Sequence, residues 1–283
     1  MAVFTKMDVT IKSHGGEPIR SFSDWEKYAL PPSRREHWKE GRSAFELGRS
    51  WTANGEPAVP RELMQLLDSN EGTRRILVLS GIVEHETPLP PPGSRGPRCH
   101  DLALQAEQDG LAVTVCIEAK ADEPFGGTVE RELSNARQRP ATRFKARLDW
   151  LTRSLLGIPA FQDDQGSVLS DLISKLPYQL LSGIAGTLLE AELQGAVKAI
   201  FLVHEFRTKK TANKKIQANA NALNSFLRLF QSMNRGSSED LTLEVGHIVG
   251  PISIADRPVT RPPKIPRNIP LFVGKLRIDR LAE

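Results

Sequence analysis

Residues 100 to 120 read HDLALQAEQDGLAVTVCIEAK, and this stretch decides the fold because it has the pattern of one tight β-hairpin. Asp109-Gly110 is a strong signal for a two-residue type I′ turn, since glycine adopts positive φ without strain. A turn centred on this pair fixes the register of the two strands. One face is then wholly apolar, with the pairs Leu102–Ile117, Leu104–Val115 and Ala106–Val113, and we expect the hairpin to be half-buried on that face.

Two carboxylates stand opposite each other at the open end of this hairpin. The same register pairs Asp101 with Glu118 and places Lys120 on the same face, two residues beyond Glu118. Opposed side chains lie roughly 4.5–5.5 Å apart between Cβ atoms, and like charges at that separation destabilise a hairpin unless something compensates them. A divalent cation would do so, and carboxylate oxygens suit magnesium or manganese. The alternative is a solvated hairpin edge with scattered charges.

Composition indicates a soluble globular protein of one large domain or two small ones. The chain has 283 residues, of which 39% are hydrophobic and 25% charged. No apolar run approaches the ~20 residues that span a bilayer, and the N-terminus lacks a secretory signal. Cys99 and Cys116 do not face each other in the hairpin, so we expect free thiols and a cytoplasmic location.

Charge is distributed unevenly along the chain. Residues 1–150 carry 21 Lys/Arg and 22 Asp/Glu, a net of −1, whereas residues 151–283 carry 17 and 12, a net of +5. A mild basic bias is consistent with a polyanionic partner. The basic stretch between Arg131 and Arg153 has two interpretations, a solvated helix surface or a phosphate-contacting surface, with Arg147 largely off the apolar face.

Hydrophobic spacing predicts the elements around the hairpin. Helices are expected over residues 33–39, 43–51, 61–68, 129–138, 141–156, 168–176, 178–193 and 216–233, and strands over 8–11, 76–83, 196–206, 241–254 and 271–278. The hairpin, the helical crossover and the strand at 196–206 indicate a βαβ unit with parallel pairing. Gly183 and Gly186 predict close packing of the crossover helix. Tyr178 and Gln179, at the start of that helix, are open to either a packing role or a position at the site.

Two further acidic positions need an explanation. Glu46 lies in the first turn of the helix at 43–51, where Ser43 and Glu46 fit a capping box with the Ser43 amide donating to the Glu46 carboxylate. Glu84, His85 and Glu86 follow the apolar strand at 76–83. They could be ligands, but charged residues after a buried strand usually mark its exit to solvent.

This order of elements and charged residues resembles the PD-(D/E)XK nuclease superfamily, including uncharacterised bacterial domains placed in it. The resemblance rests on the helix with Glu46, the strand 76–83, the hairpin with Asp101 and Glu118-Ala-Lys120, the crossover and the strand 199–206. It implies an α/β fold with a restriction-endonuclease-like core, a mixed central β-sheet flanked by helices. The core would span 40–206, with an N-terminal extension at 1–39 and an accessory helix and strands at 207–283.

The resemblance also implies a chemistry. Asp101 and Glu118 match the two motif acids and Lys120 the motif lysine, while Glu46 matches the first-helix glutamate that many members use as an extra metal ligand. One departure is His100, which stands where the motif has proline. The implied cofactor is Mg²⁺, with Mn²⁺ possible, and the Ala119 carbonyl is a further candidate ligand.

The expected activity is therefore a metal-dependent nuclease that hydrolyses phosphodiester bonds in nucleic acid, DNA in the first instance. We expect no membrane partner, and many nucleases of this fold act as homodimers. One alternative is a non-catalytic nucleic-acid-binding or interaction protein on the same fold. A third reading is a different hydrolase that uses Glu84, His85 and Glu86. The basic residues after about 207 are candidates for substrate or partner recognition.

Overall fold

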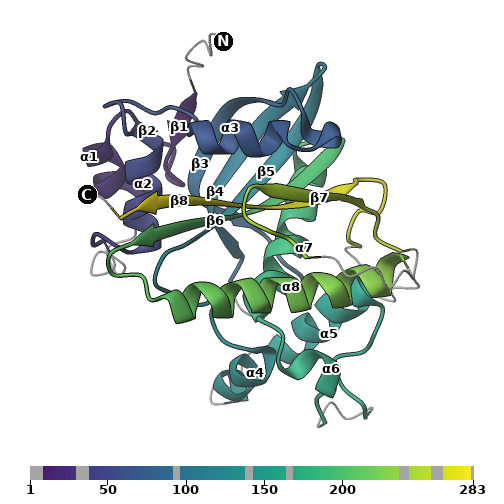
Figure 1. Cartoon of the computed structure of the whole chain (residues 1–283). Helices are drawn as coiled ribbons and strands as arrows, with labels where there is room; N and C mark the ends of the chain where they lie inside the picture. The colour runs from purple at the N-terminus through teal and green to yellow at the C-terminus, as the bar shows by residue number, and fades with distance from the viewer. Residues whose placement is uncertain are drawn as a thin grey trace.

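The protein is an α/β structure built on one mixed sheet, seen in a computed structural model that describes residues 9–29, 38–91, 96–137, 143–163, 168–235, 242–255 and 264–281 (Figure 1). The sheet order is β2-β1-β3-β4-β5-β6-β8-β7. Its strands are β1 (Thr10–Lys12), β2 (Pro18–Ile19), β3 (Leu77–Thr87), β4 (Arg98–Gln108), β5 (Leu111–Lys120), β6 (Lys198–Thr208), β7 (His247–Ile252) and β8 (Leu271–Arg280).

Helices cover both faces of this sheet. They are α1 (Phe22–Asp24), α2 (Ser43–Trp51), α3 (Arg61–Asp68), α4 (Val129–Arg137), α5 (Phe144–Leu156), α6 (Asp171–Ser174), α7 (Tyr178–Leu193) and α8 (Asn213–Arg235), with short turns at Trp25–Ala29 and Glu71–Thr73. Figure 1 shows α2 and α3 on one side of β6 and β8, and α5 and α8 on the other. None of the described helices is long and apolar enough to cross a bilayer.

The predicted hairpin is present in the predicted register. β4 and β5 pair antiparallel from Leu102–Ile117 to Gln108–Leu111, and positive φ at Asp109 (53°) and Gly110 (79°) forms the turn. Its burial differs from the expectation. The apolar face packs in the core with α2 and α3, but the opposite face is also covered, because α7 crosses it and leaves Thr114 0% exposed.

The predicted βαβ unit is confirmed. β5 and β6 pair in parallel, and the connection between them contains α4 to α7. Gly183 and Gly186 bring α7 close to the sheet as expected. A Cβ at Gly183 would lie 2.8 Å from the Phe201 ring of β6, and one at Gly186 would lie 2.8 Å from Arg98 of β4.

Several predicted boundaries need correction. The strand at 76–83 continues to Thr87, so Glu84, His85 and Glu86 lie within β3 rather than at its exit. Only Asp171–Ser174 of the predicted 168–176 helix is helical, and the predicted strand 241–254 is shorter. Most of the predicted 33–39 helix lies outside the described residues. The segment after residue 207 supplies α8, β7 and β8, and β8 lies inside the sheet between β6 and β7.

Candidate functional site

The opposed acids lie where the hairpin opens. Backbone pairing of β4 with β5 extends as far as Leu102–Ile117. Beyond that pair the Asp101 side chain replaces a backbone partner, because its Oδ2 accepts a hydrogen bond from the Ala119 amide at 2.6 Å. This bond fixes the Asp101 carboxylate beside the Glu118-Ala119-Lys120 segment.

Alternation along β5 decides which way this segment points. Ile117 and Ala119 belong to the core that packs against α2 and α3. Glu118 and Lys120 therefore point to the other face of the sheet, which α7 covers. Both are nearly buried, with 2% and 4% of their surface exposed. The sequence prediction that Asp101, Glu118 and Lys120 share one face agrees with this arrangement.

Glu118 forms ion pairs with two cations. Arg98 Nη2 donates to Glu118 Oε2, and Lys120 Nζ donates to Glu118 Oε1. Burial alone raises the pKa of this carboxyl, but the charges of Arg98 and Lys120 outweigh burial and lower its pKa below the ordinary value. Glu118 therefore stays ionised in the folded protein.

Asp101 has the opposite electrostatic environment. Burial, together with the negative charge of Glu118, raises the pKa of Asp101 to about 8. Lys120 and the Ala119 amide act in the other direction but do not cancel the effect. Near neutral pH, a second negative charge at this position is thus unfavourable unless a cation accompanies it.

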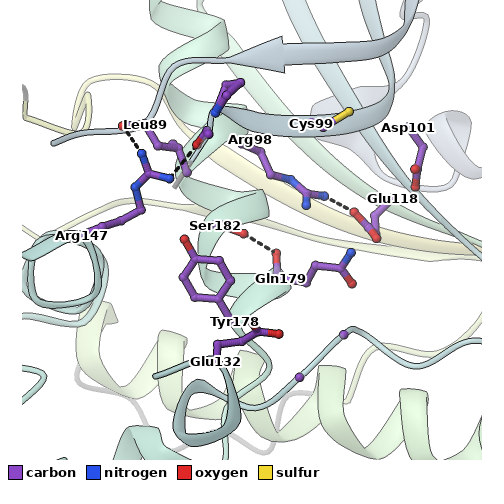
Figure 2. Close-up of a pocket in the computed structure, with 14 residues that line it drawn as sticks. Leu89, Arg98, Cys99, Asp101, Glu118, Glu132, Arg147, Tyr178, Gln179 and Ser182 are labelled. Carbon is purple, nitrogen blue, oxygen red and sulfur yellow. Dashed lines mark hydrogen bonds and ion pairs between the residues drawn. The ribbon is translucent and has the colours of Figure 1, made fainter. Parts of the chain in front are cut away.

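A cavity of about 340 Å³ opens beside these acids, and we call it the hairpin cavity. Asp101, Glu118, Arg98 and Cys99 line one wall. The start of α7 provides the facing wall through Tyr178, Gln179 and Ser182, and α4 adds Glu132 (Figure 2). Tyr178 and Gln179 therefore line the cavity beside the acids, and Tyr178 also packs against Phe144 in the core.

Arg147 corrects a prediction about the basic stretch. It is 3% exposed rather than on a solvated helix surface. Its guanidinium donates to the Leu89 carbonyl at 2.6 Å and the Gly96 carbonyl at 2.7 Å (Figure 2). It also donates to the Pro90 carbonyl at 3.3 Å. Arg147 therefore fixes the two ends of the segment that leads into β4 and Arg98.

Glu46 is not brought to the hairpin cavity. Its helix packs on the opposite face of the sheet, where Leu47 and Trp51 enter the core. Glu46 is fully buried and lines a second cavity of about 210 Å³ together with Arg49, Thr208, Lys209 and Arg280, among others. Its Oε1 accepts the Gly41 amide at 2.8 Å rather than the Ser43 amide, so the predicted capping box is wrong in its partner.

The three side chains of the Glu84-His85-Glu86 segment contact different partners rather than one another. His85 Nε2 lies 2.9 Å from Glu190 Oε2 of α7, which also accepts the Thr87 hydroxyl at 2.8 Å. Glu84 accepts the Cys99 thiol at 3.2 Å. These contacts give His85 a packing role between β3 and α7. Glu84 adds to the negative potential that raises the pKa of Asp101.

Arg98 is the site residue that sequence reasoning missed. It follows a Pro- and Gly-rich loop, and alternation from Leu102 alone would place it on the face opposite Asp101. β4 departs from this alternation, because Arg98 and His100 lie beside Gly186 of α7 whereas Leu102 packs in the core on the other face. The sequence of β4 contains no signal for this change of face.

The residues present fit a magnesium ion with few protein ligands. Mg²⁺ in proteins usually binds one or two carboxylates and keeps several waters for substrate phosphates to replace. Asp101 and Glu118 supply two carboxylates, and a cation there would offset the repulsion that raises the Asp101 pKa. No cluster of three or more His, Cys, Asp or Glu side chains suited to a metal occurs among the described residues, so a richer site is not indicated.

Fold and cavity together define an α/β protein with a mixed eight-stranded sheet and an acidic pair at the open end of its central hairpin. Residues 18–280 match the family described as Domain of unknown function (DUF6946), and the chain belongs to that family. No curated protein and no solved structure gives a significant match.

Proposed function

We propose that the protein is a metal-dependent nuclease of the PD-(D/E)XK type, acting on DNA. The observation that carries the proposal is the meeting of Asp101, Glu118 and Lys120 on one face of the sheet, beside a cavity. The strand order β3-β4-β5-β6, with α2 before it and α7 as the last crossover helix, resembles the arrangement expected of the superfamily core and supports the proposal.

Asp101 and Glu118 would hold Mg²⁺, with the Ala119 carbonyl as a further candidate ligand. When bound, the ion would supply charge stabilisation and a water of lowered pKa. Asp101 is already oriented by the Ala119 amide, so it needs little rearrangement to bind. Glu46 is left out of this ligand set because it lines the other cavity.

Lys120 has two tasks in this scheme. Its ammonium group, held by Glu118, lies where it can orient the attacking water through a hydrogen bond. It can also neutralise charge that develops on the phosphate oxygens. In the reaction, the water oxygen bonds to phosphorus, the bond from phosphorus to one sugar oxygen breaks, and the departing oxygen takes up a proton.

The test is cleavage of plasmid, linear and single-stranded DNA, and of RNA, in Mg²⁺ or Mn²⁺. We expect loss of at least about 100-fold in rate for Asp101→Asn and Lys120→Ala, the size typical of removing one such group. Glu192→Gln and Lys175→Ala remove matching charges from exposed positions and should cleave like the wild type. Cleavage that persists unchanged in Asp101→Asn and Lys120→Ala would contradict the site.

A second candidate is a non-catalytic nucleic-acid-binding protein on the same fold. It is favoured by one observation, that Arg98 and Lys120 already pair with both oxygens of Glu118. Calorimetric titration with Mg²⁺ separates the two candidates. The nuclease binds the ion through Asp101 and loses that binding in Asp101→Asn, whereas the non-catalytic protein binds nucleic acid with no metal requirement.

A further inference from the structure

Arg98 holds an unused hydrogen-bond donor at the wall of the hairpin cavity. Only 8% of the residue is exposed, and its Nη2 pairs with Glu118. Its Nε is buried and finds no hydrogen-bond partner among the described residues. Buried guanidinium N–H groups are normally paired. Arg98 lines the cavity and keeps a buried donor without an acceptor, so it is a candidate to bind a ligand there once its guanidinium turns toward the cavity.

The surroundings indicate the chemistry of that acceptor. Arg98, which lines the cavity, and Lys120, which lies beside it, both donate to Glu118, so two cations meet one carboxylate at this side of the cavity. An arginine offers adjacent N–H groups in a fixed planar fork that matches two oxygens of a phosphate. A tetrahedral oxyanion satisfies this geometry, and the cavity volume of about 340 Å³ lies within the range of small-ligand sites.

We propose that Arg98 is the phosphate-binding residue of the hairpin cavity, and that it leaves Glu118 when it binds a phosphodiester oxygen. This inference rests on the proposed function, because it assigns the phosphate to the substrate of that site. Arg98 then has two alternative partners. In the free protein it neutralises Glu118, and in the loaded protein it holds the scissile phosphate or its neighbour.

The exchange of partners has a consequence for metal binding. Both oxygens of Glu118 are paired in the free protein, so a divalent ion must compete with Arg98 for Oε2. An oxyanion that draws Arg98 away makes Glu118 available. Oxyanion and divalent ion therefore bind with positive coupling, and by reciprocity each raises the affinity of the other by the same factor. The site would then bind its metal tightly only when a phosphate is present.

Titration with Mn²⁺ by isothermal calorimetry, with and without sulfate, measures this coupling. Sulfate serves as a tetrahedral dianion that leaves Mn²⁺ in solution. We expect sulfate to lower the Mn²⁺ Kd of the wild type about 10-fold, within the usual range of coupling between sites. Arg98→Gln should bind Mn²⁺ about as tightly without sulfate as the wild type does with it, and should show no sulfate dependence.

Two variants complete the design. Arg153→Gln removes a positive charge from an exposed ion pair on α5, and it should keep the wild-type coupling. Arg98→Lys keeps the charge but lacks the fork, so it should bind Mn²⁺ as weakly as the free wild type and respond little to sulfate. Thermal unfolding reports whether each variant is folded, and Arg98→Lys carries the test if Arg98→Gln is not.

The outcomes separate this inference from the proposed function. Mn²⁺ binding that is equal in wild type and Arg98→Gln, and indifferent to sulfate in both, overturns the role of Arg98 and leaves the metal site standing. Coupling that survives in a folded Arg98→Lys also overturns the role of its fork. If none of the folded proteins binds Mn²⁺ with or without sulfate, the metal-dependent function fails together with the inference.

Discussion

Asp101→Asn should stabilise the metal-free protein at alkaline pH while removing the proposed activity. The native pKa of Asp101 is raised to about 8, whereas an aspartate in an unfolded chain titrates near about 3.9. Between these values the folded protein holds a proton that the unfolded chain has lost. The free energy of unfolding therefore falls as pH rises from about 4 to about 8.

The size of the effect follows from the shift. About 4 pKa units at about 1.4 kcal/mol per unit give an upper limit of about 5–6 kcal/mol. Asp101 keeps partial contact with solvent, so we expect about 2–3 kcal/mol in practice. Asparagine carries no charge, has nearly the same shape, and its Oδ1 can still accept the Ala119 amide. The variant should thus be more stable than wild type at pH 8.5, with the difference shrinking as pH falls toward about 4.

Urea unfolding of both proteins in EDTA, at intervals from pH 5 to pH 8.5, measures this difference. Titrating groups far from Asp101 are common to both proteins and cancel in the subtraction. A difference that does not change with pH would refute the claim that a buried carboxyl is held beside ionised Glu118. Adding Mg²⁺ at pH 8 should then stabilise the wild type but not Asp101→Asn, because only the wild type offers two carboxylates.

Three other predictions test the surroundings of the site. Burial lowers the pKa of His204 to about 3, so the free energy of unfolding falls as pH drops from about 6.5 toward 3. His204→Leu should reduce this fall by about 2–3 kcal/mol at pH 4, as measured by urea unfolding. Gly186→Ala places a Cβ 2.8 Å from Arg98 and should cost about 1–3 kcal/mol, whereas Glu192→Ala on the same helix should not. Arg147→Met removes three hydrogen bonds to carbonyl oxygens and should lower the free energy of unfolding by about 2–3 kcal/mol. Limited proteolysis between Leu89 and Gly96 should become faster, and an unchanged rate of proteolysis would contradict the anchoring role of Arg147.

The hairpin could be predicted from sequence because its information is local. A turn pair with positive φ determines the register, and alternation along the strand places Glu118 on the face of Lys120. The same is true of α7, whose two glycines indicated close approach to the sheet. These features depend on neighbours in the chain or on a single contact face.

The rest of the site depends on contacts between distant segments. The partner of Glu46 is Gly41, a backbone amide in the preceding loop, and no spacing rule distinguishes it from the Ser43 amide. The burial of Arg147 depends on three carbonyls more than 50 residues away. Arg98 reaches Glu118 because β4 changes faces between His100, which lies beside Gly186 of α7, and Leu102, which packs in the other core. Periodicity describes one element at a time and cannot report such contacts.

The pairing of Arg98 with Glu118 also explains how the acidic pair can exist without a metal. Two ionised carboxylates side by side would destabilise the open end of the hairpin. The fold avoids this repulsion in two ways. Glu118 keeps its negative charge because two cations lie beside it. Asp101 favours its protonated form because of burial and the negative charge of Glu118. A ligand that brings its own cation and takes Arg98 away reverses both conditions together. If the proposed function holds, the stability of the free protein and the binding of phosphate with metal would be alternative uses of the same four side chains, Arg98, Asp101, Glu118 and Lys120.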